Sequence, residues 1–265
     1  MCSPFSNPQS ERKQAMSGHN KWSSIKHKKG AADAKRSKTF TKVIKEITVA
    51  ARIGGEDPNA NPRLRSAVGL AKSVNMPNDN IAKAIKKGVG GDRSENWETI
   101  VYEGYGPHNV AVIVECLTDN RNRTISSIRG IFSKHNGRIG ATNSVMYMFD
   151  RLGIVEIGKS AIDEDRLMEY ALESGAEDIE TSDEELFVVK TDPSQYAEMV
   201  GVLERNAVPI DRSSIDLVPR NRVVIEDLGR ANRVIGFIET LEDDEDVQRV
   251  YSNFDISDEV LRQLG

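Results

Sequence analysis

The segment from Gly18 to Arg52 constrains the fold most, because it combines a helical apolar repeat with a row of positive charge. From Asp33 onward, apolar residues recur at steps of three and four, which is the period of an α-helix. These residues are Phe40, Val43, Ile44, Ile47 and Ala51. They share one side of a helix that turns by about 100° per residue. The cations on the opposite side are Lys35, Lys38, Lys42, Lys45 and Arg52. The segment therefore predicts an amphipathic helix with one buried face and one basic face.

The charge of this segment is almost entirely of one sign. Residues 19–52 carry ten Lys or Arg against two acids, Asp33 and Glu46. An ordinary solvated face mixes signs, so the pattern favours binding to a polyanion through phosphates, without reading of bases. The residues predicted to bind nucleic acid are Lys21, Trp22, Lys26, His27, Lys28, Lys29, Lys35, Arg36, Lys38, Lys42 and Lys45. The alternative is a solvated charged face.

Trp22 lies among five of these basic residues and allows two interpretations. An aromatic ring among cations can stack on a nucleobase. It can equally anchor the basic arm on the helices that follow. The sequence leaves both open.

The charge of the whole chain is divided unevenly. The 265 residues, enough for two or three domains, have a net charge of −5. Residues 17–93 have a net charge of +11, whereas residues 94–265 have a net charge of −17. A basic end joined to an acidic body indicates one surface that meets a polyanion and another that avoids it.

Cysteine usage and hydropathy indicate a soluble cytoplasmic protein. Cys2 and Cys116 cannot make a disulfide framework, and Cys116 lies in an apolar run, which fits a reducing compartment. No apolar stretch approaches the length of a membrane span, and residues 1–15 lack the apolar centre of a secretion signal. Residues 1–16 are polar and interrupted by prolines, so we expect a disordered extension.

Three amphipathic helices are predicted to form a basic helical domain over residues 17–93. The first is expected to end at Gly54–Gly55, and the second to begin near Pro62, a residue that suits the first turn of a helix. A third, short helix follows Pro77 and is expected to end at Gly88. Three such helices make a small bundle, and the glycine-rich residues 88–94 read as a linker.

The apolar period then changes to that of strands. Residues 98–102 and 110–116 are predicted strands, and the second is apolar on both faces, which is typical of a central strand. A helix containing Ile128 and Phe132 should follow and end at Asn136–Gly137. Val145, Tyr147 and Phe149 alternate with other residues and predict a further strand.

Residues 153–218 contain a complete set of elements in the order β-α-β-β-α-β, which is the ferredoxin-like signature. Residues 98–149 lack a second helix and a last strand, which residues 228–241 and 247–254 can supply, because neither half could cover its apolar sheet face alone. We therefore predict an α+β fold, with an N-terminal three-helix domain followed by two ferredoxin-like-type α/β domains, the middle one discontinuous. The predicted parts are 1–16, 17–93, 94–150 with 221–265, and an inserted domain at 151–220.

The loop from Thr118 to Thr124 is a candidate for a second anion site. Thr, Asp and Asn are good helix-capping residues, so an ordinary helix start is one interpretation. Cations at a helix N-terminus oppose the macrodipole, and an anion held by the exposed N–H groups would reconcile them. Acidic partners inside the protein are the competing explanation. The candidate residues are Asn120, Arg121, Asn122, Arg123 and Thr124.

No catalytic or metal constellation emerges, and the sequence predicts neither a cofactor nor a small-molecule substrate. The four histidines and two cysteines lack zinc-ligand spacing. The glycines at 88, 90 and 91 follow a helix instead of a strand, so a dinucleotide-binding loop is rejected. Glu115 and Asp119 would be the only conceivable start of a nuclease site, and Asp119 is explained as a cap. Residues 242–246 read as a solvated acidic turn.

Several long strings of the chain resemble the YebC/PmpR family of bacterial regulators, which has a mitochondrial translational-activator relative. The strings are MSGHNKWSSIKHKKGAADAKRSKTFTKVIKEI from Met16, NMPNDNIAKAIKKG (75–88), YEGYGPHNVAVIVECLTDNRNRT (102–124), NSVMYMFDRLG (143–153) and VYSNFDI (250–256). Residues 1–15 depart from the family pattern. The resemblance implies a helical N-terminal domain and two α/β domains, and a cytoplasmic protein that is not an enzyme. It places nucleic-acid binding around Lys21, Lys26, Lys28, Lys29, Lys35, Arg36 and Lys38.

Two classes of function are expected to compete. The first is a nucleic-acid-binding regulator, either a DNA-binding transcriptional regulator, as family members are generally described, or a ribosome-associated translation factor that binds ribosomal RNA. The bundle shows no obvious helix arranged to read bases, which favours recognition of backbone or RNA shape. The second class is a protein–protein adaptor, in which the acidic body docks a partner and the basic domain steers the encounter. No membrane partner is expected.

Overall fold

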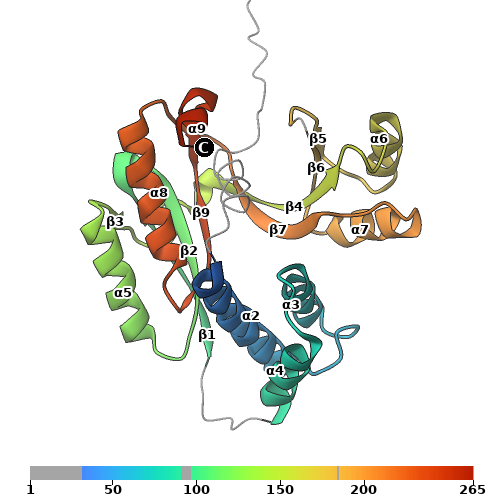
Figure 1. Cartoon of the computed structure of the whole chain (residues 1–265), viewed down its shortest axis with the longest axis horizontal. Coiled ribbons are helices and arrows are strands. Elements are labelled where there is room, and N and C mark those ends of the chain that lie inside the picture. The colour runs from blue at the N-terminus through green and yellow to red at the C-terminus, as the bar shows by residue number, and fades with distance from the viewer. Residues whose placement is uncertain (1–31, 91–96, 184, 265) are drawn as a thin grey trace, which may run out of the picture. The chain divides into compact units, whose positions relative to one another are not determined.

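The computed structural model describes residues 32–90, 97–183 and 185–264 (Figure 1). The described chain divides into two compact units, one formed by Arg151–Leu217 and the other by the rest. The predictions for residues 1–16, and for Lys21, Trp22, Lys26, His27, Lys28 and Lys29, lie outside the described residues. The predicted class, mixed helix and sheet with N-terminal helices followed by sheet-containing segments, is confirmed. The domain boundaries stay a prediction.

Three helices follow one another at the start of the described chain: α2 (Ala32–Gly54), α3 (Pro62–Ser73) and α4 (Asn78–Gly90). Their shared core is made of the predicted stripes, including Ile47, Leu64 and Ile81. Asn61 caps α3, because its side-chain oxygen accepts the N–H of Leu64, and its amide group also donates to the Ala50 carbonyl oxygen. The predicted end of the first helix and start of the second are confirmed.

The third helix runs past its predicted end at Gly88. A Cβ at this residue would lie 2.4 Å from the Thr48 carbonyl oxygen, so only glycine allows α2 and α4 to approach this closely. Gly88 therefore serves helix packing instead of ending the helix, and α4 continues to Gly90.

One four-stranded sheet has the order β3-β1-β2-β9. Its strands are β1 (Glu98–Tyr105), β2 (Ala111–Thr118), β3 (Arg138–Ile139) and β9 (Val247–Ser252). The central pair is an antiparallel hairpin, with Tyr102 opposite Val114. The predicted central position of residues 110–116 is confirmed, and segments far apart in sequence share this sheet. With a hairpin at its centre, the strand order differs from that of a ferredoxin-like sheet.

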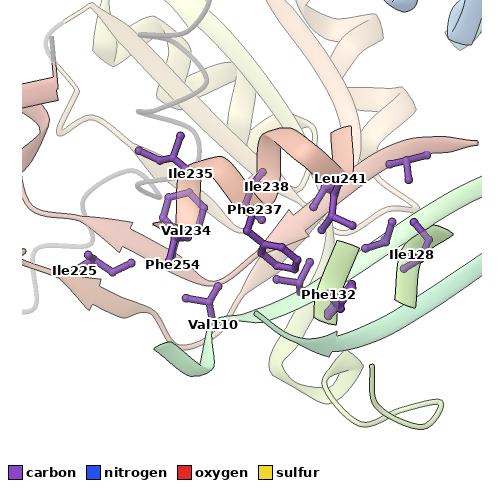
Figure 2. Packing of buried hydrophobic residues seen from close by; sticks show 14 of the residues in the cluster. Val110, Ile128, Phe132, Ile225, Val234, Ile235, Phe237, Ile238, Leu241 and Phe254 are labelled. Carbon is purple, nitrogen blue, oxygen red and sulfur yellow. The ribbon is translucent and has the colours of Figure 1, made fainter. Parts of the chain in front are cut away.

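Two helices, α5 (Arg121–Lys134) and α8 (Leu228–Glu242), cover one face of this sheet (Figure 1). Phe132 of α5 and Phe237 of α8 meet edge to face, with ring centroids 5.0 Å apart (Figure 2). Both side chains are almost fully buried. Two short strands, β8 (Val223–Ile225) and β10 (Phe254–Ile256), pair in parallel beside this core, and α9 (Asp258–Leu264) ends the chain.

The strand predicted over residues 145–149 is wrong. Met146–Met148 form a short 3-10 helix, and the strand β4 begins at Phe149 and runs to Gly158. The N–H groups of Val145 and Met146 both donate to the Glu103 carboxylate, at 2.9 and 2.8 Å, which turns the backbone here. Val145 and Phe149 are buried and Tyr147 is exposed. The alternation of these three residues in the sequence therefore reflects a tight turn and not a strand.

The second unit shows the predicted order of elements, with strand order β5-β6-β4-β7. This is the ferredoxin-like arrangement, with the first and third strands side by side and antiparallel. After β4 its elements are α6 (Glu164–Glu173), β5 (Asp178–Glu180), β6 (Leu186–Thr191), α7 (Tyr196–Arg205) and β7 (Arg212–Pro219). Across the described ranges of both units, no helix is long and apolar enough to cross a membrane.

Candidate nucleic-acid interface

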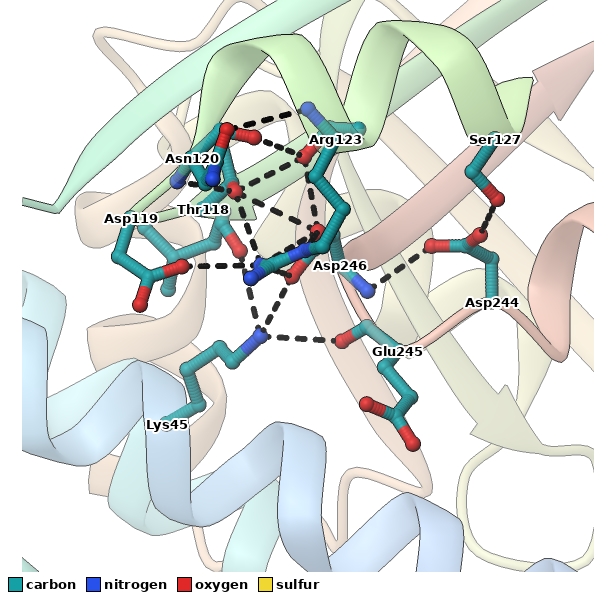
Figure 3. A network of polar contacts seen from close by, with 11 residues as sticks. Lys45, Thr118, Asp119, Asn120, Arg123, Ser127, Asp244, Glu245 and Asp246 are labelled. Carbon is teal, nitrogen blue, oxygen red and sulfur yellow. Dashed lines mark hydrogen bonds and ion pairs between the residues drawn. The ribbon is translucent and has the colours of Figure 1, made fainter. Parts of the chain in front are cut away.

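Three lysines of the predicted basic face contact the acidic turn between α8 and β9. Lys38 forms an ion pair with Asp243, with Nζ 3.4 Å from the carboxylate oxygen. The ammonium group of Lys42 donates to the carbonyl oxygen of Glu242. Lys45 donates to Asp246, at 3.0 Å, and to the carbonyl oxygen of Glu245, at 3.1 Å (Figure 3). The acidic turn at residues 242–246, which is predicted to be solvated, therefore contacts the lysines of α2 instead.

Lys45 is well enclosed, with a side chain 15% exposed against 51% for Lys38. Its ammonium group also contacts the Leu117 carbonyl oxygen, at 3.4 Å, and lies 4.9 Å from the centre of the Trp97 ring. Burial lowers the pKa of Lys42, although Asp244, Glu242 and Asp243 oppose the shift. The inner part of the basic face is thus a contact within the protein, whereas the Lys38 side chain remains half exposed.

The second candidate site lies at the N-terminus of α5. Asn120 caps the helix by accepting the N–H of Arg123, at 3.1 Å. The guanidinium of Arg123 donates to Asp246, at 3.0 Å, and to Asp119, at 2.9 Å. Thr124 donates its hydroxyl proton to Asp246, at 2.8 Å. The anion at this helix start is a side chain of the protein itself, which agrees with the alternative of an internal acidic partner.

Asp246 joins the two candidate sites into one network (Figure 3). Its side chain is 7% exposed and receives Lys45 from α2 and Arg123 and Thr124 from α5. Burial alone would raise the pKa of Asp246, but the hydrogen bonds from Thr124, Arg123 and Lys45 outweigh it and lower the pKa. The hydrogen bond to Asp246, with that to Asp119, raises the pKa of Arg123. The carboxylate is therefore held in its charged form.

Sequence reasoning missed Asp246. Two features of the sequence point to it. The Thr118–Thr124 loop has two arginines but only one acidic residue, and an acidic run comes just before the strand that pairs with β2. The structure places Arg121 and Asn122 on the surface, apart from this network. Lys35 and Arg36 belong to α2, but their side chains lie outside the described part of the chain.

The helix α4 adds cations that the predicted set did not include. Its residues Lys83, Lys86 and Lys87 are exposed and lie on one side of the helix at steps of three and four. On α3, Arg63 pairs instead with Glu46, with the two atoms Nε and Oε1 2.7 Å apart. The exposed positive charge of α2, α3 and α4 thus includes Lys38, Arg65 and Lys72 of α3, and the three lysines of α4.

Chemistry by a metal or a thiol finds no support in the described residues. Within these ranges, no group of three or more His, Cys, Asp or Glu side chains could hold a metal ion. Cys116 is fully buried in β2, and burial raises the pKa of its thiol to about 12. Gly88 packs against α2 and does not form a phosphate-binding loop. The expectation that the protein is not an enzyme stays a prediction.

The fold and the charge distribution define a class of protein with basic N-terminal helices followed by two sheet-bearing segments. The chain belongs to the TACO1/YebC family. The family's N-terminal domain matches residues 20–91, and its second and third domains match residues 97–254. The resemblance read from the sequence is confirmed.

Relatives and a solved structure extend over most of the chain. A "probable transcriptional regulatory protein" (DP2908) of Desulfotalea psychrophila is 52% identical over 250 residues, which is 94% of this chain and 100% of that protein. A protein of the same description (GSU1074) from Geobacter sulfurreducens is 52% identical over 249 residues, again 94% and 100% of the two chains. The crystal structure of the conserved hypothetical protein Aq1575 from Aquifex aeolicus is similar, with a TM-score of 0.76 and 45% identity, and covers 86% of this chain and 94% of that one.

Proposed function

We propose that this protein is a DNA-binding transcriptional regulator that contacts phosphates through its basic N-terminal segment. The observation that carries the proposal is the charge of residues 19–52, with ten cations against two acids. The relatives named as probable transcriptional regulatory proteins support the regulatory part. The family resemblance favours a cytoplasmic location and a protein without enzymatic activity.

The contacts of Lys42 and Lys45 support a smaller set of phosphate-binding residues than the sequence predicts. Lys45 is enclosed by the acidic turn, and Lys42 has lost solvent, so neither can meet a nucleic acid while this contact holds. We therefore assign the phosphate contacts to the cations from Lys21 to Lys38, with the exposed lysines of α4 as a second row. Such contacts position a protein on a duplex without specifying a sequence.

A second candidate function is a ribosome-associated translation factor that binds ribosomal RNA. The physical argument is that contacts of lysines with the phosphate backbone recognise any phosphate chain, and that the exposed cations of α2 and α4 are lysines, whose charge is a point charge. A sequence-specific DNA reader would instead present Asn, Gln or Arg to base edges. In the adaptor alternative, a partner protein docks on the acidic sheet-bearing part, and the basic segment only steers the association of the two proteins.

Competition at one fixed salt concentration tests the proposal, because the electrostatic part of binding depends steeply on salt. Labelled full-length protein is bound to duplex DNA and challenged with purified ribosomes, and the reverse experiment is run in parallel. Displacement from ribosomes by DNA, with one promoter sequence outcompeting others, supports transcriptional control. Retention on ribosomes in the presence of excess DNA supports the translation factor. Binding to neither leaves only the adaptor.

A further inference from the structure

A second surface lies at the edge of the sheet where β3 pairs with β1 (Figure 1), with Tyr105 opposite Arg138. The guanidinium carbon of Arg138, an exposed residue of β3, lies 4.8 Å from the centre of the Tyr105 ring. Tyr147 is 65% exposed, and its loop reaches Tyr105, whose hydroxyl group donates to the carbonyl oxygen of Ser144 at 3.4 Å. None of these residues belongs to the network around Asp246.

The loop that carries Tyr147 is fixed by a buried carboxylate. Glu103 is 4% exposed and accepts the N–H groups of Asn143, Val145 and Met146, at 2.7, 2.9 and 2.8 Å. Its own carbonyl oxygen accepts the N–H of Gly140, at 2.8 Å. Burying a charged carboxylate is costly unless such donors compensate it. The fold therefore uses a buried charge to hold one surface loop in a single shape.

The loop that carries Tyr147 is also fixed by glycines at which the backbone passes close to neighbouring atoms. A Cβ on Gly137 would lie 2.8 Å from the carbonyl oxygen of Tyr105, and a Cβ on Gly140 would lie 2.2 Å from the Ser144 hydroxyl oxygen. Asn143 adopts a φ of 63°, in the left-handed region. These contacts leave the loop little freedom, so the backbone that carries Tyr147 is held in place and its side chain faces solvent.

A solvent-exposed aromatic ring on a fixed loop that contacts the stacked pair of Tyr105 and Arg138 has a chemical use. Single-stranded nucleic acids are bound by stacking of unpaired bases on aromatic rings and on arginine planes, with the positive charge near the phosphates. Ordering the loop before binding lowers the entropy that the complex loses. We propose that Tyr105, Arg138 and Tyr147 form a stacking site for an unpaired nucleobase of single-stranded nucleic acid. The site shares only the class of ligand with the proposed function, because its contacts are with bases instead of phosphates.

The test compares two oligonucleotides of equal length and charge, one intact and one in which abasic residues replace several central nucleotides. Full-length protein is titrated with each strand at two salt concentrations. The ratio of the two affinities isolates stacking, whereas the salt dependence isolates phosphate contacts. We expect the wild-type protein to prefer the intact strand by about five- to 100-fold, the range measured for stacking on one aromatic side chain.

Substitutions at Tyr147 and Arg138 test whether this surface causes the preference for the intact strand. Tyr147→Ala should reduce the ratio to near one, Tyr147→Trp should keep it, and Arg138→Gln should reduce it in part. Leu172→Ala on α6, where the leucine is 80% exposed, is the matched control and should leave the ratio unchanged. Tyr147→Trp also shows that loss in the alanine variant comes from the missing ring.

Two results would overturn the site. The first is a wild-type ratio near one, as expected if the surface docks a protein instead. The second is a ratio that survives Tyr147→Ala. Failure of the proposed function gives a different result, namely an affinity that hardly changes with salt. In that case the ratio of the affinities for the intact and abasic strands still tests the stacking site.

Discussion

Lys45 and Asp246 form an ion pair that joins α2 to the start of β9, with Nζ and Oδ1 3.0 Å apart. Their side chains are 15% and 7% exposed, so both charges have lost most of their water. Removing one partner of such a pair leaves the other charge buried and uncompensated, which costs more than the pair itself contributes.

The substitution Asp246→Ala is therefore expected to lower the free energy of unfolding by about 3 kcal/mol, because Lys45, Arg123 and Thr124 lose the carboxylate that they share. Asp243→Ala is the matched control, since Asp243 and its partner Lys38 are about half exposed. Such an exposed pair contributes at most about 1 kcal/mol. Urea unfolding of the three proteins measures the difference. Equal losses in the two variants would contradict the network.

The contribution of Asp246 should disappear in acid. Its pKa lies below the ordinary value of 3.8, so the folded protein binds this proton less readily than the unfolded chain. The stabilisation is fully present above that ordinary value and is lost as the pH falls through the lowered pKa. The difference in unfolding free energy between wild type and Asp246→Asn should thus shrink below about pH 4. A difference that stays constant down to about pH 2 would mean that the carboxylate is not held charged.

Removing the charge of the acidic turn should strengthen nucleic-acid binding. The variant Glu242→Gln, Asp243→Asn, Asp244→Asn and Glu245→Gln keeps Asp246 but removes four negative charges beside the lysines of α2. We expect its affinity for duplex DNA to rise several-fold at low salt, because like-charge repulsion falls.

The matched control for this variant neutralises four exposed acids of α6. They are Glu164, Asp165, Glu169 and Glu173. Both variants change the net charge by the same amount, so fluorescence anisotropy at one salt concentration compares them directly. An equal gain in affinity would show that only total charge matters and that the turn has no special relation to the basic face.

Cys116 should not react with thiol reagents while the protein is folded. Its side chain is fully buried, and its pKa of about 12 leaves almost no thiolate at neutral pH. In a Cys2→Ser background, a chromogenic disulfide reagent should detect no thiol until denaturant is added, and one thiol afterwards. Rapid reaction of the folded protein would show that β2 opens locally.

Sequence patterns located elements well where local signals decide the structure. The end of α2 at Gly54 and the start of α3 at Pro62 follow from glycine and proline chemistry. The turn at Met146–Met148 has the sequence pattern of a strand because its deciding contact is with the carboxylate of Glu103, 43 residues before Met146. No periodicity within a short window can reveal such a bond.

The candidate site was predicted in part for the same reason. The basic face of α2 is visible in the sequence as a helical repeat of lysines. In the structure, the acidic turn between α8 and β9 contacts Lys38, Lys42 and Lys45. Their acceptor, the turn that ends with Asp246, lies 200 residues further on, and only the pairing of β9 with β2 brings it close. Local composition shows the acidic run at residues 242–246 but not which cations it contacts.

The most direct test of the central claim is the salt dependence of DNA binding by the full-length protein and by a variant with Lys28, Lys29, Lys35 and Lys38 changed to Glu. A matched variant changes Arg129, Lys134, Arg151 and Arg166, which are exposed elsewhere, to Glu. If the basic segment contacts phosphates, the first variant should lose binding, with a slope of log affinity against log salt smaller by about 3 to 4. The second should keep most of the wild-type slope. Equal slopes for wild type and the first variant would contradict the assignment of nucleic-acid binding to this segment.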